Sequence, residues 1–293
     1  GTSFLIILII ALLLEKNRVI ISRITASLIL AVLLIGPGHY QDGGDEKLKI
    51  TVIQPLTTNM ERIINMTNEA ESDLVIWPEA VTKFDENVSE LVPNKVVIGG
   101  FFRQDNTNVY TSAINLKTGH HYDKRNLVPF GEFQPFGSLL KSINNFFNIP
   151  NSSLSRGSFY QTKADWSALI CWELVFNETF TRRVRGTKYI VHMSNDKWYG
   201  SSMPAQHLKH AKARAVESNK WVVRATLDGI SQIISPRSNE SSVILERGEM
   251  GSITHEITLN SQDTFYIKHG DTPLLIISVL SLMFGIFFRK YEK

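Results

Sequence analysis

Three apolar runs without a single charged residue constrain this chain more than any other feature. They cover residues 4–14, 24–36 and 273–288, at the two ends of a 293-residue chain, and a mixed, polar segment separates them. A helix that spans a bilayer needs roughly 20 apolar residues, with about 17 as the lower limit. Each run is shorter, which also suits a buried core helix, but none has the polar face of a surface helix. We therefore predict membrane-spanning helices at both ends.

Positive charges beside these runs predict their orientation. Lys16, Arg18 and Arg23 lie between the first two runs, and the basic tail "RKYEK" follows the third. Short loops that carry positive charge stay on the cytoplasmic side. Both clusters therefore place the long middle segment outside the cell. We expect three parts: two transmembrane helices in 1–40, a periplasmic catalytic domain in 41–270, and a transmembrane helix with a cytoplasmic tail in 271–293.

The middle segment has the pattern of an α/β domain. Apolar stretches that resemble strands alternate with helical stretches, and such alternation predicts a sheet covered by helices. The net charge of +3 does not suggest nucleic acid as a partner. We expect strands at 48–55, 73–80, 95–102, 165–173 and 188–196, helices at 59–72 and 204–220, and hairpins at 108–124 and 221–235.

The chain holds one cysteine, Cys171, at the end of an apolar stretch and directly before Trp172 and Glu173. A buried free cysteine often acts only as a small hydrophobic residue. A lone thiol cannot form an internal disulfide, however, and in an oxidising compartment a spare thiol is a liability. This favours a reactive role for Cys171. Glu173 either contributes to the same site or is a solvated residue in the first turn of a helix.

Further polar residues follow the ends of other predicted strands: Glu79, Lys124 and the pair 195–196. In open α/β sheets this edge is where sites form. A thiol nucleophile needs a base, and Glu79 in its apolar "VIWPEA" surroundings is a candidate. Lys124 is a candidate for stabilising an oxyanion. The alternatives are that Glu79 begins a helix and that Lys124 is an ordinary surface lysine.

Seven stretches carry a resemblance to a known family. They occur in the same order along most of residues 50–271. The chain resembles the apolipoprotein N-acyltransferase family of the nitrilase, or carbon–nitrogen hydrolase, superfamily in "WPEA" (77–80), "YDKRNLVPFGEFQPF" (122–136), "ICWE" (170–173), "SNDKWYG" (194–200), "QHLKHAKARAVE" (206–217), "RATLDGISQIISPRS" (224–238) and "FYIKHGD" (265–271).

The resemblance implies a four-layer αββα sandwich flanked by transmembrane helices. It implies Glu79 as general base, Lys124 as oxyanion stabiliser and Cys171 as nucleophile. The family has about eight spans, and this sequence shows three. We therefore expect the chain to be part of a longer protein whose first four or five spans are missing here.

The resemblance also implies residues that order the site. These are Glu132 in "PFGE", Glu173 in "CWE", and Trp172 between Cys171 and Glu173, a position where the family more often has tyrosine. No metal or cofactor is implied, and the eight histidines include no H-E-x-x-H pattern.

The implied reaction is an acyl transfer at the bacterial inner membrane. A fatty acyl chain moves from a phospholipid donor, through a cysteine thioester, to the N-terminal amine of a diacylglyceryl-modified lipoprotein. One alternative is a membrane-tethered amide or nitrile hydrolase that uses the same three residues with water as acceptor. Another is an inactive remnant that only binds lipoproteins or other partners, against which the intact triad argues.

Residues 137–153 follow the Glu132 motif and have the spacing of an amphipathic helix. Five apolar side chains fall on one face, and they include Phe146 and Phe147. Two phenylalanines on such a helix can sit at the boundary between headgroups and acyl chains. We predict an interfacial lid that admits the lipid. The alternative is a helix packed on its own domain.

Overall fold

The computed structural model describes residues 24, 44–134, 154–237 and 240–276. The chain divides into two compact units, Gly1–Gln41 and Asp42–Lys293. Within the described ranges, no helix is long and apolar enough to cross a membrane.

Several predictions from the sequence lie outside these ranges. The apolar runs 4–14 and 24–36, apart from Ile24, are outside them, as is most of 273–288. The predicted lid helix, with Phe146 and Phe147, is outside them as well. The membrane helices and the lid therefore stay predictions.

The second unit is built on two β-sheets. The described part of the larger sheet has the order β11-β1-β2-β4-β5-β6, with β3 paired to β4, and the smaller has the order β10-β9-β8-β7. Strands β1, β2 and β4 are mutually parallel, as are β7, β8 and β9. The strands are β1 (Lys47–Gln54), β2 (Leu74–Ile76), β3 (Thr82–Lys83), β4 (Val96–Asp105), β5 (Asn108–Asn115), β6 (His121–Asp123), β7 (Trp166–Ile170), β8 (Tyr189–Ser194), β9 (Val222–Thr226), β10 (Gln232–Ile234) and β11 (Gly251–Thr258).

Three buried clusters show how the layers stack. One cluster joins the facing sides of both sheets, with Ile76 and Ile98 from the larger and Ile170 and Val191 from the smaller. A second lies between the smaller sheet and the helices α5 and α6. A third lies between the larger sheet and α3. The helices are α3 (Met60–Asn68), α5 (Asn177–Val184), α6 (Met203–Ser218) and α7 (Phe265–His269), with short 3-10 helices η1 (Glu86–Leu91), η3 (Cys171–Val175) and η4 (Asp196–Trp198).

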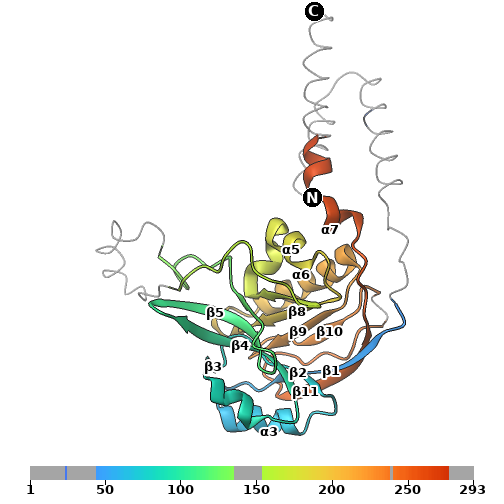
Figure 1. The fold of residues 1–293 in the computed structure, drawn as a ribbon. Coiled ribbons are helices and arrows are strands. Elements are labelled where there is room, and N and C mark those ends of the chain that lie inside the picture. Colours follow the sequence, from blue (N-terminus) through green and yellow to red (C-terminus); the bar gives the residue numbers. More distant parts are fainter. Residues whose placement is uncertain (1–23, 25–43, 135–153, 238–239, 277–293) are drawn as a thin grey trace, which may run out of the picture. The chain divides into compact units, whose positions relative to one another are not determined.

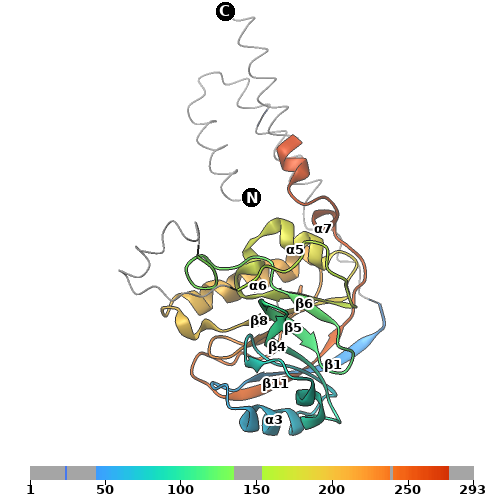
Figure 2. The same cartoon turned by 60° about the vertical axis from the view of Figure 1, so that its left-hand side comes forward.

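The result is the four-layer αββα sandwich that the sequence predicts. Figures 1 and 2 show α3 on the outer face of the larger sheet and α6 on the outer face of the smaller one. Strands covered on both faces read as continuous apolar runs rather than alternating ones. Strand β7, "WSALI", and strand β8, "YIVHMS", are accordingly buried along their whole length.

A polar link crosses the sandwich beside the parallel strand ends. Gln54 ends β1 of the larger sheet, and its Oε1 accepts hydrogen bonds from the hydroxyls of Thr226 and Ser231, each at 2.6 Å. Both donors belong to the smaller sheet or to the residue just before its strand β10. Because these groups are buried, the bonds satisfy them and also fix one sheet against the other.

Most predicted elements form, and the differences have local causes. The predicted helices 59–72 and 204–220 are α3 and α6, and both predicted hairpins are present. Strand β11 was not predicted; it pairs antiparallel with β1. The predicted strand 165–173 ends at Ile170, because the chain turns into η3 at Cys171.

Candidate active site

The polar residues selected from the sequence gather at one edge of the sandwich. Glu79 follows β2, Lys124 follows β6, Cys171 follows β7, and residues 195–196 follow β8. Carboxyl ends of parallel strands open at the same edge of a sheet. Two antiparallel steps, β4 to β5 and β5 to β6, bring the end of β6 to that edge too.

Lys124 is the centre of this group. Its Nζ donates to Oε1 of Glu132 at 2.6 Å and to Oε1 of Glu79 at 3.0 Å. The side chain is fully buried, so the alternative of an ordinary surface lysine is wrong. Burial by itself lowers the pKa of Lys124, but the negative charges around it, those of Glu79 and Glu132 among them, outweigh burial and hold that pKa above its usual value. Lys124 is therefore a fixed ammonium between two carboxylates.

Glu79 is buried and held from two sides. Its Oε1 accepts from Lys124, and its Oε2 accepts from the backbone N–H of Asn195 at 3.0 Å. No helix begins at Glu79, so that alternative is wrong. Burial raises the pKa of this carboxyl group despite the nearby lysine. Gly100 of β4 makes room for the turn, since a Cβ there would lie 2.6 Å from the Cα of Glu79.

Cys171 is the first residue of η3 and lies in the left-handed region, with φ of 54°. A non-glycine residue there is uncommon and stores strain, and such residues cluster at functional sites. Cys171 is 4 % exposed. Burial, followed by the negative charge of Glu79, raises its pKa from 9.0 to about 12, although Lys124 acts in the opposite direction. The resting group is therefore a neutral thiol near neutral pH.

Glu173 ties the Cys171 turn to the segment after Lys124. Its Oε1 accepts from the hydroxyl of Tyr122 at 2.8 Å and from the backbone N–H groups of Arg125 and Asn126 at 2.7 and 3.0 Å. Its Oε2 accepts from the N–H of Ile170 at 2.9 Å. Glu173 has no exposed surface, so the alternative of a solvated residue is wrong. Its place between the two segments suits a residue that orders the site.

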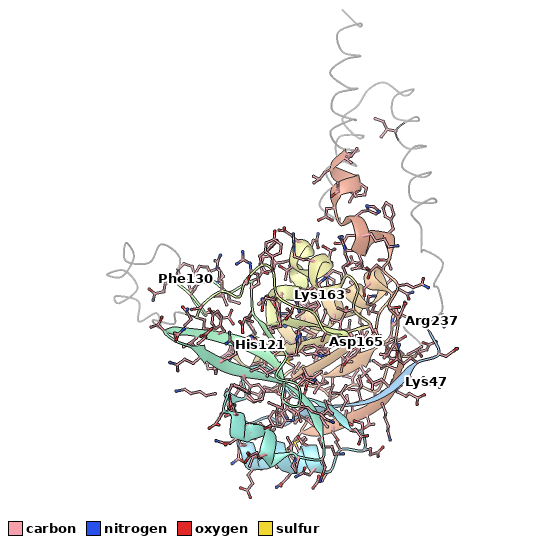
Figure 3. The ribbon with its side chains drawn as sticks, in the orientation of Figure 1. Lys47, His121, Phe130, Lys163, Asp165 and Arg237 are labelled. Atoms are coloured by element: carbon pink, nitrogen blue, oxygen red, sulfur yellow. The ribbon has the colours of Figure 1, made fainter. Side chains whose placement is uncertain are left out.

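Glu132 closes the loop that follows Lys124. Its Oε2 accepts from the backbone N–H of Val128 at 2.8 Å, while its Oε1 binds Lys124. Phe130 lies at the outer end of this loop, about half exposed (Figure 3). The loop is therefore fastened at its inner end by the buried lysine and open to solvent at its outer end.

Tyr199 is a member of the site that the sequence did not single out. Its hydroxyl accepts from the indole Nε1 of Trp172 at 3.1 Å, and it lies near enough to Cys171 for the two groups to act on each other electrostatically. Burial and the neighbouring thiol raise the pKa of Tyr199. It lies in "SNDKWYG", a stretch that carried the family resemblance, but nothing in the residue pattern assigned this tyrosine a role.

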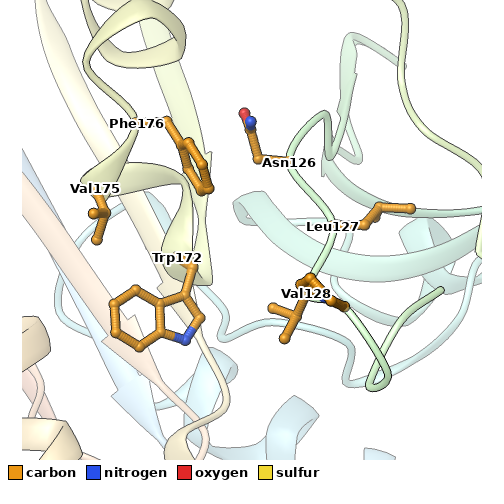
Figure 4. A pocket seen from close by; sticks show the side chains of 7 residues that line it. Asn126, Leu127, Val128, Trp172, Val175 and Phe176 are labelled. Carbon is orange, nitrogen blue, oxygen red and sulfur yellow. The ribbon is translucent and has the colours of Figure 1, made fainter. Parts of the chain in front are cut away.

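A small pocket opens beside the Cys171 turn. It has a volume of ≈ 270 Å³ and lies between the loop after Lys124 and helix η3 (Figure 4). Almost all of the side chains that line it are apolar. They are Asn126, Leu127, Val128, Pro129, Trp172, Val175 and Phe176.

A second, buried polar cluster near Cys171 comes from the smaller sheet, η4 and α6. Its members are His192, Asp196, His207 and Arg224, none of which has any exposed surface. The sequence offered one signal for it, namely polar residues inside the apolar strands "YIVHMS" and "VVRAT". Within the described ranges, no group of His, Cys, Asp or Glu side chains is arranged to hold a metal ion.

Comparison with known proteins shows the family to which the chain belongs. The family described as carbon-nitrogen hydrolase matches residues 94–264. The chain is 32 % identical to an apolipoprotein N-acyltransferase of Shewanella oneidensis, over 76 % of this chain and 49 % of the relative. It is 30 % identical to one of Vibrio parahaemolyticus, over 83 % of this chain and 54 % of the relative. The chain thus spans about half the length of these curated relatives.

A solved structure supports the fold. The chain superposes on a CN-hydrolase superfamily protein of Xanthomonas campestris, whose crystal structure carries an arsenic adduct in the active site, with a TM-score of 0.53. The superposition covers 72 % of this chain and 91 % of the other, at 16 % sequence identity. The predicted nitrilase-like architecture is therefore confirmed.

Proposed function

Because the chain belongs to the carbon–nitrogen hydrolase family, we propose that it is an acyltransferase of the apolipoprotein N-acyltransferase type. It moves a fatty acyl chain from a phospholipid to the N-terminal amine of a diacylglyceryl-cysteine lipoprotein. The observation that carries this proposal is the buried Lys124, which binds two carboxylates and acts electrostatically on the only thiol of the chain. The names of the relatives support this choice of substrates. The chain covers about half the length of those relatives.

The first half-reaction acylates Cys171. The Sγ–H proton passes to the carboxylate of Glu79 as the sulfur attacks the ester carbonyl of the phospholipid. A base with a raised pKa suits this transfer, because the thiol is neutral before attack. The ammonium of Lys124 stabilises the oxyanion of the tetrahedral intermediate. The bond to the glycerol oxygen then breaks, that oxygen takes the proton from Glu79, and a lysophospholipid leaves.

The second half-reaction transfers the acyl group. The α-amine of the lipoprotein attacks the thioester carbonyl and gives a proton to Glu79. The C–S bond breaks, the sulfur takes that proton back, and an amide has formed. Glu132 and Glu173 hold the surrounding segments throughout, since each fastens one end of the loop after Lys124.

The pocket beside Cys171 suits part of an acyl chain. Its lining is almost wholly apolar, so a hydrocarbon chain gains free energy by leaving water there. A buried thioester is also shielded from water, which favours transfer to an amine over hydrolysis. We place this domain on the periplasmic side of the bacterial inner membrane, held by the apolar runs at both ends.

Intact-mass measurement tests the proposal. The full chain is incubated with phosphatidylethanolamine vesicles, and we expect an added mass of one fatty acyl group on Cys171. Addition of a diacylglyceryl-cysteine lipopeptide should remove this mass and yield an acylated peptide. The Cys171→Ala variant is the control and should take up no acyl mass.

Two other results would overturn the proposal. An acyl adduct that is lost equally fast without lipopeptide, with release of free fatty acid, indicates the tethered hydrolase. If no phospholipid gives an adduct but the chain still binds the lipopeptide, the chain is the inactive remnant.

A further inference from the structure

The buried polar cluster behind Cys171 forms a continuous chain of hydrogen bonds. His207 Nδ1 lies 2.8 Å from Oδ1 of Asp196, and Oδ2 of Asp196 accepts from Arg224 Nη2 at 2.7 Å. Arg224 Nη1 lies 2.7 Å from Nδ1 of His192. His192 Nε2 lies 3.1 Å from the carbonyl oxygen of Cys171. The chain thus ends on the backbone of the nucleophile.

These contacts determine the tautomer of His192. A guanidinium has donors only, so Nδ1 of His192 must accept from Arg224. Nε2 then carries the proton and donates it to the carbonyl oxygen of Cys171, which can only accept. Arg224 Nη1 also lies 3.5 Å from Nε2, too far to compete with its 2.7 Å contact. Burial, and then the positive charge of Arg224, hold the pKa of His192 well below its usual value, which agrees with a neutral ring.

The carbonyl that His192 holds is part of the peptide between Cys171 and Trp172. This peptide is planar and trans, so the N–H of Trp172 points opposite to the carbonyl of Cys171. The carbonyl is directed to His192, and the N–H is therefore directed away from the buried cluster. The first N–H groups of a helical turn have no acceptor within that turn, and Trp172 is the second residue of η3.

The left-handed conformation of Cys171 makes this support necessary. A non-glycine residue at φ of 54° persists only where surrounding contacts hold it. His192, in the neighbouring strand β8, supplies such a contact through its hydrogen bond to the carbonyl oxygen of Cys171. Asp196 in turn holds Arg224, whose Nε also donates to the carbonyl oxygen of Ile230 at 2.9 Å.

We propose that His192 is a positioning residue for the nucleophile, and that Arg224, fixed by Asp196, sets its tautomer. The neutral ring donates to the carbonyl of Cys171 and so orients the 171–172 peptide, with its N–H directed to the oxyanion that forms beside Cys171. The part of this inference that concerns the oxyanion rests on the proposed acyl transfer. The tautomer and its contacts do not depend on it.

Two substitutions at His192 separate positioning from packing. In His192→Gln, the amide oxygen can accept from Arg224 and the amide nitrogen can donate to the carbonyl of Cys171. In His192→Leu, the volume is kept and both contacts are lost. We expect the leucine variant to acylate Cys171 up to about 100-fold more slowly than wild type, and the glutamine variant to be about tenfold faster than the leucine variant. A packing role predicts the opposite order, because leucine suits an apolar core better than an amide does.

The acylation rate is measured as the burst of p-nitrophenol from a short-chain p-nitrophenyl ester, which needs no lipoprotein acceptor. The Cys171→Ala variant shows which part of the burst belongs to the thiol. Equal rates for the leucine variant and wild type, or a glutamine variant as slow as the leucine variant, overturn the inference. If the leucine variant does not fold, a glutamine variant that is more than about 100-fold slower than wild type also overturns the inference.

A spectroscopic measurement reads the tautomer directly. Long-range ¹H–¹⁵N spectra are recorded on the resting full chain labelled at histidine, and the His192→Gln variant identifies the signal of His192. We expect a proton on Nε2 and a bare Nδ1. A proton on Nδ1, or a doubly protonated ring at neutral pH, refutes the inference whether or not the chain transfers acyl groups. A correct tautomer in a chain that acylates no lipopeptide refutes only the proposed function.

Discussion

The ammonium of Lys124 lies 2.6 Å from the carboxylate of Glu132, closer than to the carboxylate of Glu79, its second partner at 3.0 Å. Glu132 belongs to the same loop as Lys124. Glu79 instead follows β2, which lies on the opposite side of β4 from strands β5 and β6 that lead to Lys124. The loop that carries Glu132 therefore holds the lysine in place, and Glu79 remains available for proton transfer.

The Glu132→Gln variant tests this division. The amide oxygen can still accept from Lys124 or from Val128, but the charge is lost. A hydrogen bond to a charged group contributes about 1.5–3 kcal/mol, so we expect acylation of Cys171 to slow by about 10- to 100-fold. The burst rate with a p-nitrophenyl ester measures this. An unchanged rate with an unchanged melting temperature would mean that Glu132 does not hold the lysine.

The nucleophile itself is tested by two substitutions at Cys171. Cys171→Ala should abolish both the acyl adduct and the transfer while leaving the fold intact, because it removes only one buried sulfur. Cys171→Ser should be nearly as inactive, since a serine hydroxyl is far less acidic than a thiol and Glu79 is a weak base for it. Circular dichroism confirms folding and intact mass reports the adduct. Transfer of an acyl group by the alanine variant would refute the mechanism.

The strand pattern predicts that Glu79 and Cys171 lie at strand ends, because each follows an apolar strand. Lys124 follows the short polar strand β6, and it is the resemblance that predicts it meets the other two. The αββα sandwich followed from the resemblance, which was based on short stretches such as "WPEA" and "ICWE". Neither prediction required knowledge of how distant side chains contact one another.

The rest of the site depends on such contacts. Tyr199 reaches Cys171 through the packing of Trp172 against it, and His192 reaches the same residue from the neighbouring strand. No local pattern reveals either contact. The sequence likewise leaves the burial of Glu173 open, because a carboxylate after a strand is usually solvated and is buried only where donors surround it. Its four donors come from two segments that only the fold brings together.

The raised pKa of Cys171 predicts a loss of stability at high pH. The folded chain keeps the thiol proton up to a pKa of about 12, whereas the unfolded chain loses it near 9.0. The stabilising contribution is therefore fully present below about pH 9 and is lost as the pH rises towards 12, at up to ~1.4 kcal/mol per pH unit. We expect the free energy of unfolding of wild type to fall more steeply over this window than that of Cys171→Ala. Parallel curves would contradict a buried, neutral thiol.

The predicted orientation in the membrane can be tested with single cysteines. In a Cys171→Ala background, a cysteine replacing Asn239 should react with a membrane-impermeant maleimide added to intact cells. A cysteine replacing Glu292, in the basic tail, should react only after the cells are lysed. The reason is that positively charged short segments stay in the cytoplasm. The reverse pattern would place the active site inside the cell and exclude a periplasmic lipoprotein as its substrate.

The hydroxyl of Tyr199 provides the sharpest single-atom test of the site. It already accepts the indole proton of Trp172, and a tyrosine hydroxyl has one proton of its own to donate. That proton is available to the sulfur of Cys171, which acts on Tyr199 electrostatically. Donation from Tyr199 to the sulfur is worth most when the sulfur carries negative charge, because hydrogen bonds to charged groups are roughly twice as strong as neutral ones.

Tyr199→Phe removes this donor and keeps the ring that packs against Trp172. We expect the burst rate of Cys171 acylation to fall by about tenfold or more, which corresponds to the loss of one hydrogen bond to a charged group. The melting temperature should change little, since Tyr199 is only partly buried and keeps its ring in the variant. Trp172→Phe is the matched control, because it removes the indole that fixes the hydroxyl and leaves the hydroxyl in place. A phenylalanine variant at 199 that acylates as fast as wild type would show that the hydroxyl does not act on the sulfur.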